Sequence, residues 1–283
     1  MKNKYSITIS LILMYLFAFC TSSDNKSNEK NDTVRNLIDI VEKDSTYLSD
    51  SLILQIDSVI PGFEAPILEK DTFLTYQVDP AKQNLKLYWK DDKNQAFSSF
   101  QNLKKYVESK NQTLVFAMNA GMYMPDCTPL GLFIQNCKTL RPINKKSSNY
   151  GNFYSKPNGI FYIDTNNVAT ICKTEDFIPG KNIKYATQSG PMLLIDGEMH
   201  PTFKSRSLNS LIRNGVGILP DNQVIFVLSA KEINFYDFAN YFKQLGCKNA
   251  LFLDGVISGA YLPEKNWTDN DGFFGPMMGV TSN

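Results

Sequence analysis

One acidic residue stands where an apolar run breaks into a glycine turn. Asp254 follows the run 250–253 and precedes Gly255. Functional side chains tend to collect at the carboxyl ends of strands, so Asp254 is the first candidate for a catalytic nucleophile or base. The alternative is a plain turn, in which the Asp side chain accepts hydrogen bonds from nearby backbone N–H groups.

Loops that combine glycine with amide, hydroxyl or guanidinium groups recur through the second half of the chain. Glycine lets backbone N–H groups approach a ligand closely, arginine binds phosphate oxygens through paired hydrogen bonds, and side-chain amides bind hydroxyls. The sequence therefore predicts a site that binds a sugar or a phosphate, with Asp254 and Arg213 as its catalytic residues. The predicted binding residues are Asn119, Gly121, Asn158, Gln188, Ser189, Gly190, Asn214, Gly255 and Ser258.

Five of these loops, taken in their order along the chain, resemble the phosphodiester glycosidase family. The similarity spans roughly 113–280 and is closest to a bacterial branch of exported proteins. It is carried by the segments Asn119–Tyr123, Lys156–Gly159, Gln188–Pro191, Arg213–Gly217 and Asp254–Gly259. Where the family has Asp-Gly-Gly-Gly-Ser, this chain has Val256 and Ile257 in place of two glycines, so its loop geometry and its substrate are expected to differ.

The resemblance implies hydrolysis of a sugar linked through its anomeric carbon to a phosphate diester, either a small molecule or a glycan. It implies Asp254 as nucleophile or base and Arg213 as the phosphate clamp, with the polar loop residues as donors. Glycoside hydrolysis usually uses two carboxylates. No second one is evident, because the Asp196-Gly197 pair is typical of a hairpin turn.

Two other functions fit the same residues. The chain could be a non-catalytic carbohydrate-binding lipoprotein, or a hydrolase of ordinary glycosidic or other phosphate ester bonds. No cofactor is predicted, and no metal site is indicated by ligand spacing, although Asp254 with loop carbonyls could hold a divalent cation. His200, the single histidine, could move protons near neutral pH, but its place beside Pro201 favours a structural role.

Two amphipathic helices and many short strands must position these loops. A helix is predicted at 234–245, with Asn234 as its N-cap, Asp237 in its first turn and Gly246 as its stop. Another is predicted at 98–109. The fold class is therefore α+β, with mixed β-sheets and a few packed helices. The predicted strands are 73–78, 85–89, 114–118, 132–135, 160–163, 168–172, 192–195, 215–219, 224–228 and 250–253.

The N-terminus reads as an export signal. Lys2 and Lys4 precede an apolar stretch at 7–19 and then Cys20, which resembles a bacterial lipobox. We expect a cell-envelope protein anchored by lipid at Cys20, with an ordinary cleaved signal or an uncleaved anchor as alternatives. The expected divisions are a signal at 1–20, a polar tether at 21–33, a helical accessory segment at 34–72 and the α+β domain at 73–283.

The net charge limits the expected binding partners, and the cysteine content limits the possible disulfides. Among 283 residues the formal net charge is +1, which gives no electrostatic basis for binding nucleic acid or an anionic membrane surface. Membrane contact is expected only through the N-terminal anchor. Besides Cys20, four cysteines allow three disulfide pairings, and an exported protein could oxidise them; they are Cys127, Cys137, Cys172 and Cys247.

Overall fold

The structure is a computed structural model that describes residues 73–147, 151–205, 207–254, 257–269 and 272–282. The chain divides into two units, and the unit formed by 68–205 and 209–283 contains every helix and strand discussed here. The expected signal, tether and accessory segment lie outside the described residues, as do Cys20 and Gly255. No helix in the described ranges combines the length and apolar character needed to cross a membrane.

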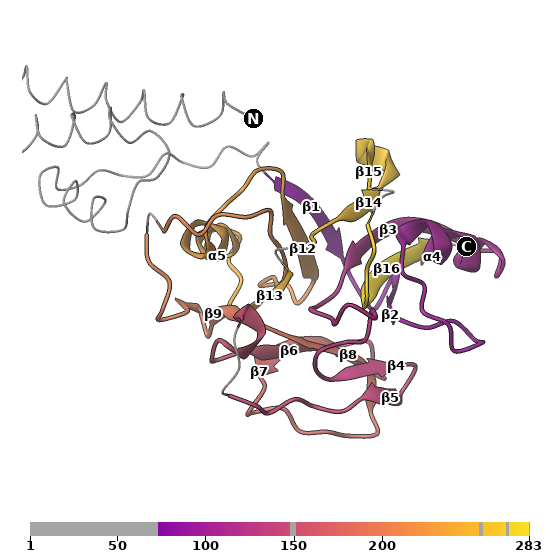
Figure 1. The fold of residues 1–283 in the computed structure, drawn as a ribbon, viewed down its shortest axis with the longest axis horizontal. Coiled ribbons are helices and arrows are strands. Elements are labelled where there is room, and N and C mark those ends of the chain that lie inside the picture. The colour runs from indigo at the N-terminus through magenta and orange to yellow at the C-terminus, as the bar shows by residue number, and fades with distance from the viewer. Residues whose placement is uncertain (1–72, 148–150, 206, 255–256, 270–271, 283) are drawn as a thin grey trace, which may run out of the picture. The chain divides into compact units, whose positions relative to one another are not determined.

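A first sheet of six antiparallel strands has the order β1-β12-β11-β13-β9-β10 (Figure 1). Its apolar runs are continuous because both faces are covered: in β13, Leu251 and Leu253 face the central core while Ala250 and Phe252 face α5. The strands are β1 (Phe73–Val78), β9 (Met192–Ile195), β10 (Glu198–Met199), β11 (Asn214–Ile218), β12 (Val224–Ser229) and β13 (Ala250–Asp254).

A second and a third sheet, each of five antiparallel strands, complete the framework. The second has the order β15-β14-β3-β16-β2 and the third β5-β4-β8-β6-β7. The strands of the second sheet are β2 (Asn84–Tyr88), β3 (Thr113–Asn119), β14 (Ala260–Leu262), β15 (Trp267–Thr268) and β16 (Met277–Ser282). Those of the third are β4 (Phe133–Gln135), β5 (Lys138–Arg141), β6 (Gly159–Asp164), β7 (Ala169–Lys173) and β8 (Ile183–Ser189).

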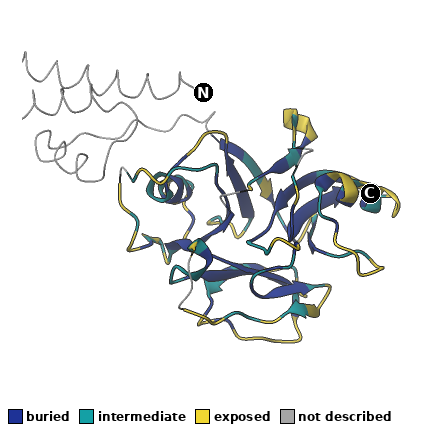
Figure 2. Ribbon diagram, in the orientation of Figure 1, coloured by how far each residue is buried: buried dark blue, intermediate teal, exposed yellow. Residues whose placement is uncertain are grey.

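The three sheets share one hydrophobic core. Phe226 of the first sheet contacts Phe116 of the second and Phe161 of the third, with ring centroids 5.4 and 6.2 Å apart. All three rings are buried, and buried strands line the interior in Figure 2. Such aromatic contacts add to the stabilisation from burial alone. The common core therefore holds the ends of strands from different sheets in fixed positions.

In the described part of the chain, two α-helices cover the outer faces of the sheets, and two 3₁₀ turns (Asn152–Tyr154 and Pro263–Lys265) lie in loops. Helix α4 (Phe100–Glu108) packs on β3, and α5 (Phe235–Gln244) packs on β9. As predicted, the Asn234 side chain caps α5 by accepting from the backbone N–H of Asp237 at 2.9 Å. Gly246, with φ of +81°, follows the last turn.

The observed fold combines strands with helices as expected, but the sheets dominate. The prediction of mixed sheets is wrong, because the described strand pairs are antiparallel. Every strand predicted from an apolar run is present, and the Asp196-Gly197 hairpin joins β9 to β10 with positive φ at both residues. The sequence interpretation missed six strands, because their residues show no clear apolar alternation or lie in very short runs; they are β5, β8, β10, β14, β15 and β16.

The cysteines outside the N-terminal region carry free thiols. Cys127 is buried and Cys137 exposed, and the staple between them that the sequence allowed is not formed. Cys247 is buried and Cys172 is half-buried.

Candidate active site

Asp254 ends β13 in a protected position. Its relative exposure is 7%, and its backbone N–H donates to Oδ1 of Asn214 at 2.8 Å. The amide of Asn119 lies 3.4 Å from the carboxylate Oδ2, which is a weak contact at the outer limit of a hydrogen bond. The carboxylate therefore stands where the first sheet meets β3 of the second.

Asn119 and Asn214 form a buried clamp between the two sheets. Nδ2 of Asn214 donates to the backbone carbonyl of Asn119 at 2.9 Å and to its Oδ1 at 2.8 Å. Asn119 also donates to the carbonyl of Ile257 at 2.9 Å and accepts from the N–H of Gly259 at 3.1 Å. Because their groups are used internally, the two predicted sugar donors fix Asp254 and the loop after it.

Arg213 is fully buried, with 0% relative exposure. Its Nε donates to the carbonyl of Ile233 at 2.7 Å, and Nη2 donates to Asn209 at 2.8 and 3.2 Å. The guanidinium carbon lies 3.7 Å from the ring centroid of Phe235 and 5.4 Å from that of Phe252, a cation–π arrangement. The side chain is thus held on the face of β13 that also carries Phe252, two residues before Asp254.

The charge of Arg213 is poorly compensated. Within the described ranges Arg213 has no ion pair, and its Nη1 has no hydrogen-bond partner. Burial lowers the pKa of Arg213 to about 10. A buried cation without a counter-charge is unfavourable, so one guanidinium edge is available to an anion. None of its contacts goes to Asp254.

Gln188, predicted to bind a ligand, forms hydrogen bonds within the fold. Its Nε2 donates to the carbonyl of Asn144 at 2.7 Å and to Oγ1 of Thr174 at 3.2 Å. Its Oε1 accepts from the N–H groups of Leu132 and Asn144, both at 2.9 Å. All its hydrogen-bonding capacity is used, so the side chain secures the end of β8.

Ser189 and Asn158 are likewise engaged within the fold. Ser189 donates to the carbonyl of Leu253 at 2.8 Å, one residue before Asp254. Asn158 donates to the carbonyl of Phe153 at 2.8 Å and accepts from Nζ of Lys156 at 2.9 Å. Both are buried, so these contacts help to position the strands behind the carboxylate.

Ser258 and the predicted glycines shape the surrounding loops. The hydroxyl of Ser258 donates to the carbonyl of Asp254 at 2.7 Å. A Cβ on Gly121 would lie 2.8 Å from Oγ1 of Thr187, and one on Gly190 would lie 2.4 Å from Cβ of Asn158. These two glycines therefore permit close packing between loops.

Tyr123 is an ionisable group close enough to Asp254 to feel its charge, and the sequence analysis did not include it among the site residues. Its hydroxyl donates to the carbonyl of Phe273 at 2.6 Å. Burial, and then the negative charge of Asp254, raise the pKa of Tyr123, so the phenol stays protonated. The nearest signal in the sequence is its place in the Asn119–Tyr123 segment.

His200 lies in an aromatic stack. Its ring centroid is 4.8 Å from that of Phe203, which in turn is 4.9 Å from Phe235. Its Nδ1 accepts from the backbone N–H of Thr202 at 3.3 Å, and burial lowers its pKa. These contacts favour the structural role. In the part of the chain that the structure describes, no three His, Cys, Asp or Glu side chains are grouped to hold a metal ion.

Comparison with known proteins shows the family to which the chain belongs. A model of the phosphodiester glycosidase family matches residues 112–275. The uncharacterized protein YigE of Escherichia coli K12 is 38% identical over 192 residues, which cover 68% of this chain and 74% of YigE.

One solved structure is similar in fold, and a second is a weaker match. The catalytic domain of zebrafish N-acetylglucosamine-1-phosphodiester alpha-N-acetylglucosaminidase, auto-inhibited by its pro-peptide, gives a TM-score of 0.53 at 14% identity, covering 78% of this chain and 85% of that one. A Burkholderia pseudomallei protein described as exported gives a TM-score of 0.48 at 9% identity, covering 74% of this chain and 73% of that one.

Proposed function

Because the chain belongs to the phosphodiester glycosidase family, we propose that it hydrolyses the bond between the anomeric carbon of a sugar and a phosphate diester. Asp254 acts as nucleophile or base, and Arg213 holds the phosphate. The observation that carries this proposal is the convergence of β3, β11 and β13 on one clamped carboxylate. A fixed geometry of this kind is what catalysis by positioning requires.

The chemistry needs one base and one stabilised leaving group. Water attacks the anomeric carbon as Asp254 takes its proton, the bond from that carbon to the phosphate oxygen breaks, and the electron pair leaves with the phosphate monoester. If Asp254 instead attacks directly, a glycosyl ester forms first and water then hydrolyses it. Phosphate leaves more readily than an alkoxide and needs less help from a general acid. The positive charge of Arg213 therefore stabilises the leaving group in place of a second carboxylate.

Arg213 supports this role through its unsatisfied charge and its free Nη1 edge. Its full burial means that a phosphate reaches the guanidinium only when the residues that cover it move aside. Tyr123 stays protonated beside Asp254 and is too weak an acid to protonate the departing phosphate oxygen, so the phosphate leaves as an anion held by Arg213. These assignments extend the family resemblance to particular atoms of this chain.

The decisive experiment compares the wild type with Asp254→Asn on a panel of sugar-1-phosphate diesters, with released sugar and phosphate monoester as the readout. We expect loss of hydrolysis by at least about 100-fold, the usual scale for removing a catalytic acid or base. Asp196→Asn is the matched control, since asparagine suits the positive φ of that turn residue, and it should keep full activity.

The opposite outcome is equally informative. If the wild type and Asp254→Asn bind the same glycan equally and neither hydrolyses any diester or glycoside, the enzyme proposal fails. The non-catalytic carbohydrate-binding alternative would then hold.

We further propose that the protein acts in the cell envelope, exported by its N-terminal segment and anchored by lipid at Cys20. The support is the basic start, the apolar stretch 7–19 and the cysteine that follows it. Partition of the wild type into a detergent phase, and release of Cys20→Ala into the aqueous phase, would support the anchor. Equal partition of both proteins would contradict it.

A further inference from the structure

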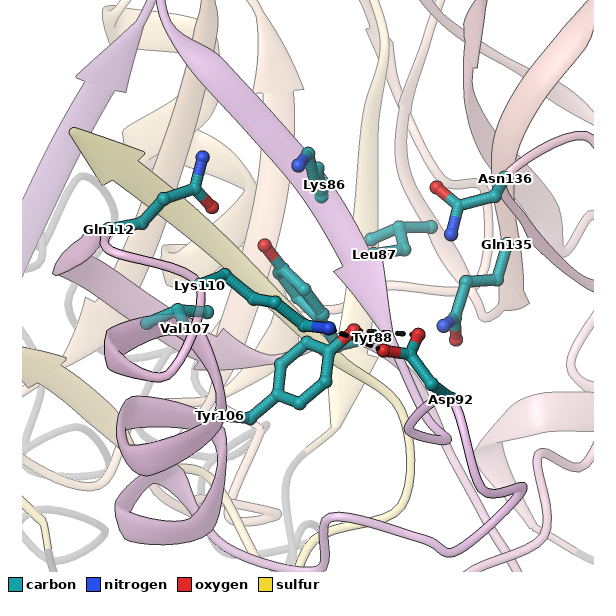
Figure 3. Close-up of a pocket in the computed structure, with 10 residues that line it drawn as sticks. All are labelled: Lys86, Leu87, Tyr88, Asp92, Tyr106, Val107, Lys110, Gln112, Gln135 and Asn136. Atoms are coloured by element: carbon teal, nitrogen blue, oxygen red, sulfur yellow. Dashed lines mark hydrogen bonds and ion pairs between the residues drawn. The ribbon is translucent and has the colours of Figure 1, made fainter. Parts of the chain in front are cut away.

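A cavity of about 310 Å³ lies between β2, the segment after α4 and the β4–β5 turn (Figure 3). Gln112, which lines it, precedes β3, whereas Asn119 ends β3 beside Asp254. Seven residues of extended strand span roughly 20 Å. The cavity is therefore separate from the candidate active site, and nothing inferred about it rests on the proposed function.

The charges around the cavity are mainly positive. Lys110 forms an ion pair with Asp92 at 2.8 Å, and Asp92 also accepts from the hydroxyl of Tyr106 at 2.9 Å (Figure 3). Lys86 has no ion pair or hydrogen bond to any residue that the structure describes. Burial, and then the charge of Lys184, lower the pKa of Lys86. An anion in the cavity would relieve both effects.

Unused donors accompany this charge. The Oδ1 of Asn136 accepts from the hydroxyl of Tyr185 at 2.8 Å, and the Oε1 of Gln112 accepts from Thr281 at 3.4 Å. This leaves the NH₂ groups of both amides without a partner among the described residues, and both amides line the cavity. Tyr88 adds a hydroxyl. A site with surplus donors suits a ligand rich in oxygen acceptors.

We propose that this cavity binds a small anionic sugar, a hydroxyl-bearing ring that carries one phosphate or carboxylate group. Lys86 and Lys110 bind the acidic group, and the amides of Gln112 and Asn136 bind hydroxyls. The volume lies at the lower end of the range for small-molecule sites, about 300–1,000 Å³. Because most of the lining side chains are polar, the cavity does not suit an apolar ligand.

Isothermal titration of the wild type with four probes tests the ligand class. Glucose 6-phosphate and glucuronate represent the phosphate and carboxylate forms of the ligand. Glucose carries only the hydroxyl-bearing ring, and inorganic phosphate carries only the acidic group, so these two probes are the half-ligands. We expect at least one of the two anionic sugars to bind at least tenfold more tightly than both half-ligands. Binding of glucose as tight as that of the anionic sugars would overturn the role of charge. Equally tight binding of phosphate would overturn the role of the ring, and no binding of either sugar would overturn the whole proposal.

Substitutions test whether the anionic sugar binds in this cavity. Lys86→Gln should weaken binding at least tenfold, whereas Lys105→Gln, on the exposed side of α4, should leave it unchanged. Asp254→Asn should bind as the wild type does, which separates this site from the proposed active site. If Asp254→Asn loses binding and Lys86→Gln keeps it, the sugar sits at the active site and the proposal is wrong. Unchanged thermal midpoints in all three variants verify that each is folded.

Discussion

At the scale of single residues, the candidate site contains buried side-chain amides that form hydrogen bonds with each other and with the backbone. Asn214 is bonded on one side to the N–H of Asp254 and on the other to Asn119. A buried polar network of this kind specifies one arrangement when every group has a partner, and it becomes costly when one is removed. The carboxylate is therefore rigidly placed, and Arg213 is the residue whose hydrogen-bonding capacity is left incomplete.

Arg213 should distinguish charged from uncharged substrates. For Arg213→Gln we expect hydrolysis of phosphodiester substrates to fall by about 100-fold or more, since one charged donor to a developing anion is removed. Hydrolysis of the matching nitrophenyl glycoside should change little. The ratio of the two rates in one preparation controls for partial unfolding. Equal losses on both substrates would instead support a hydrolase of ordinary glycosidic bonds.

His200 should make stability depend on pH. Its folded pKa lies below the ordinary value of 6.5 because the ring is buried. As pH falls below about 6.5 the unfolded chain takes up the proton first, so stability is lost by up to about 1.4 kcal/mol per pH unit. It levels off below the folded pKa. Urea unfolding at pH 7 and pH 5 should show a smaller loss for His200→Gln than for the wild type, and an equal loss would argue against a buried neutral imidazole.

At the scale of elements, β11 lets helix α5 approach the sheet that carries Asp254. Gly215 and Gly217 of β11 face the rings of Phe238 and Phe242 of α5. An added Cβ on Gly217 would lie 2.7 Å from the Phe242 ring and 2.8 Å from Sγ of Cys247. The absence of side chains on this face allows close packing of helix and strand, which in turn supports β13.

Gly217→Ala should therefore destabilise the fold by about 1–3 kcal/mol, the usual cost of overpacking a core. Chemical denaturation measures the change. Gly279→Ala is the control, because its Cβ would lie no closer than 3.2 Å to any neighbour, the end of the Leu114 side chain, and its loss should be smaller. A larger loss in the control would contradict the account of helix packing on β11.

At the scale of the whole molecule, three sheets around one core bring remote strand ends together. β3 belongs to one sheet and β11 and β13 to another, yet their ends share the hydrogen bonds that fix Asp254. The cavity proposed to bind an anionic sugar lies at the other end of β3. The same framework thus presents two polar sites at opposite ends of one strand.

Because the four cysteines in the described part of the chain are free thiols, the folded domain should not depend on an oxidising environment. The thermal midpoint should be the same with and without a reductant. A disulfide between Cys127 and Cys137 would contribute about 2–4 kcal/mol, and its reduction would lower the midpoint by several degrees. Mass analysis after thiol alkylation of the unreduced protein provides the independent check, and a protected Cys127–Cys137 pair would overturn the assignment.

The sequence by itself determined the local features of this protein. Apolar runs defined strands such as β12 and β13, Asn234 and Gly246 defined the ends of α5, and the Asp196-Gly197 pair defined a hairpin. The ordered loops also indicated the family, now confirmed by the match over 112–275. These features depend on neighbours in the chain, and periodicity and turn chemistry report neighbours directly.

Only the tertiary structure decided which polar groups remain available. Asn119 and Asn214 are 95 residues apart, and nothing in either segment indicates that they bind each other. Gln188 and Ser189 were predicted to face a ligand but bond within the fold, and the guanidinium of Arg213 is buried against aromatic rings. Hydrogen-bond partners of buried side chains are set by packing between remote elements, so sequence patterns identify candidates for a site but not the contacts each one makes.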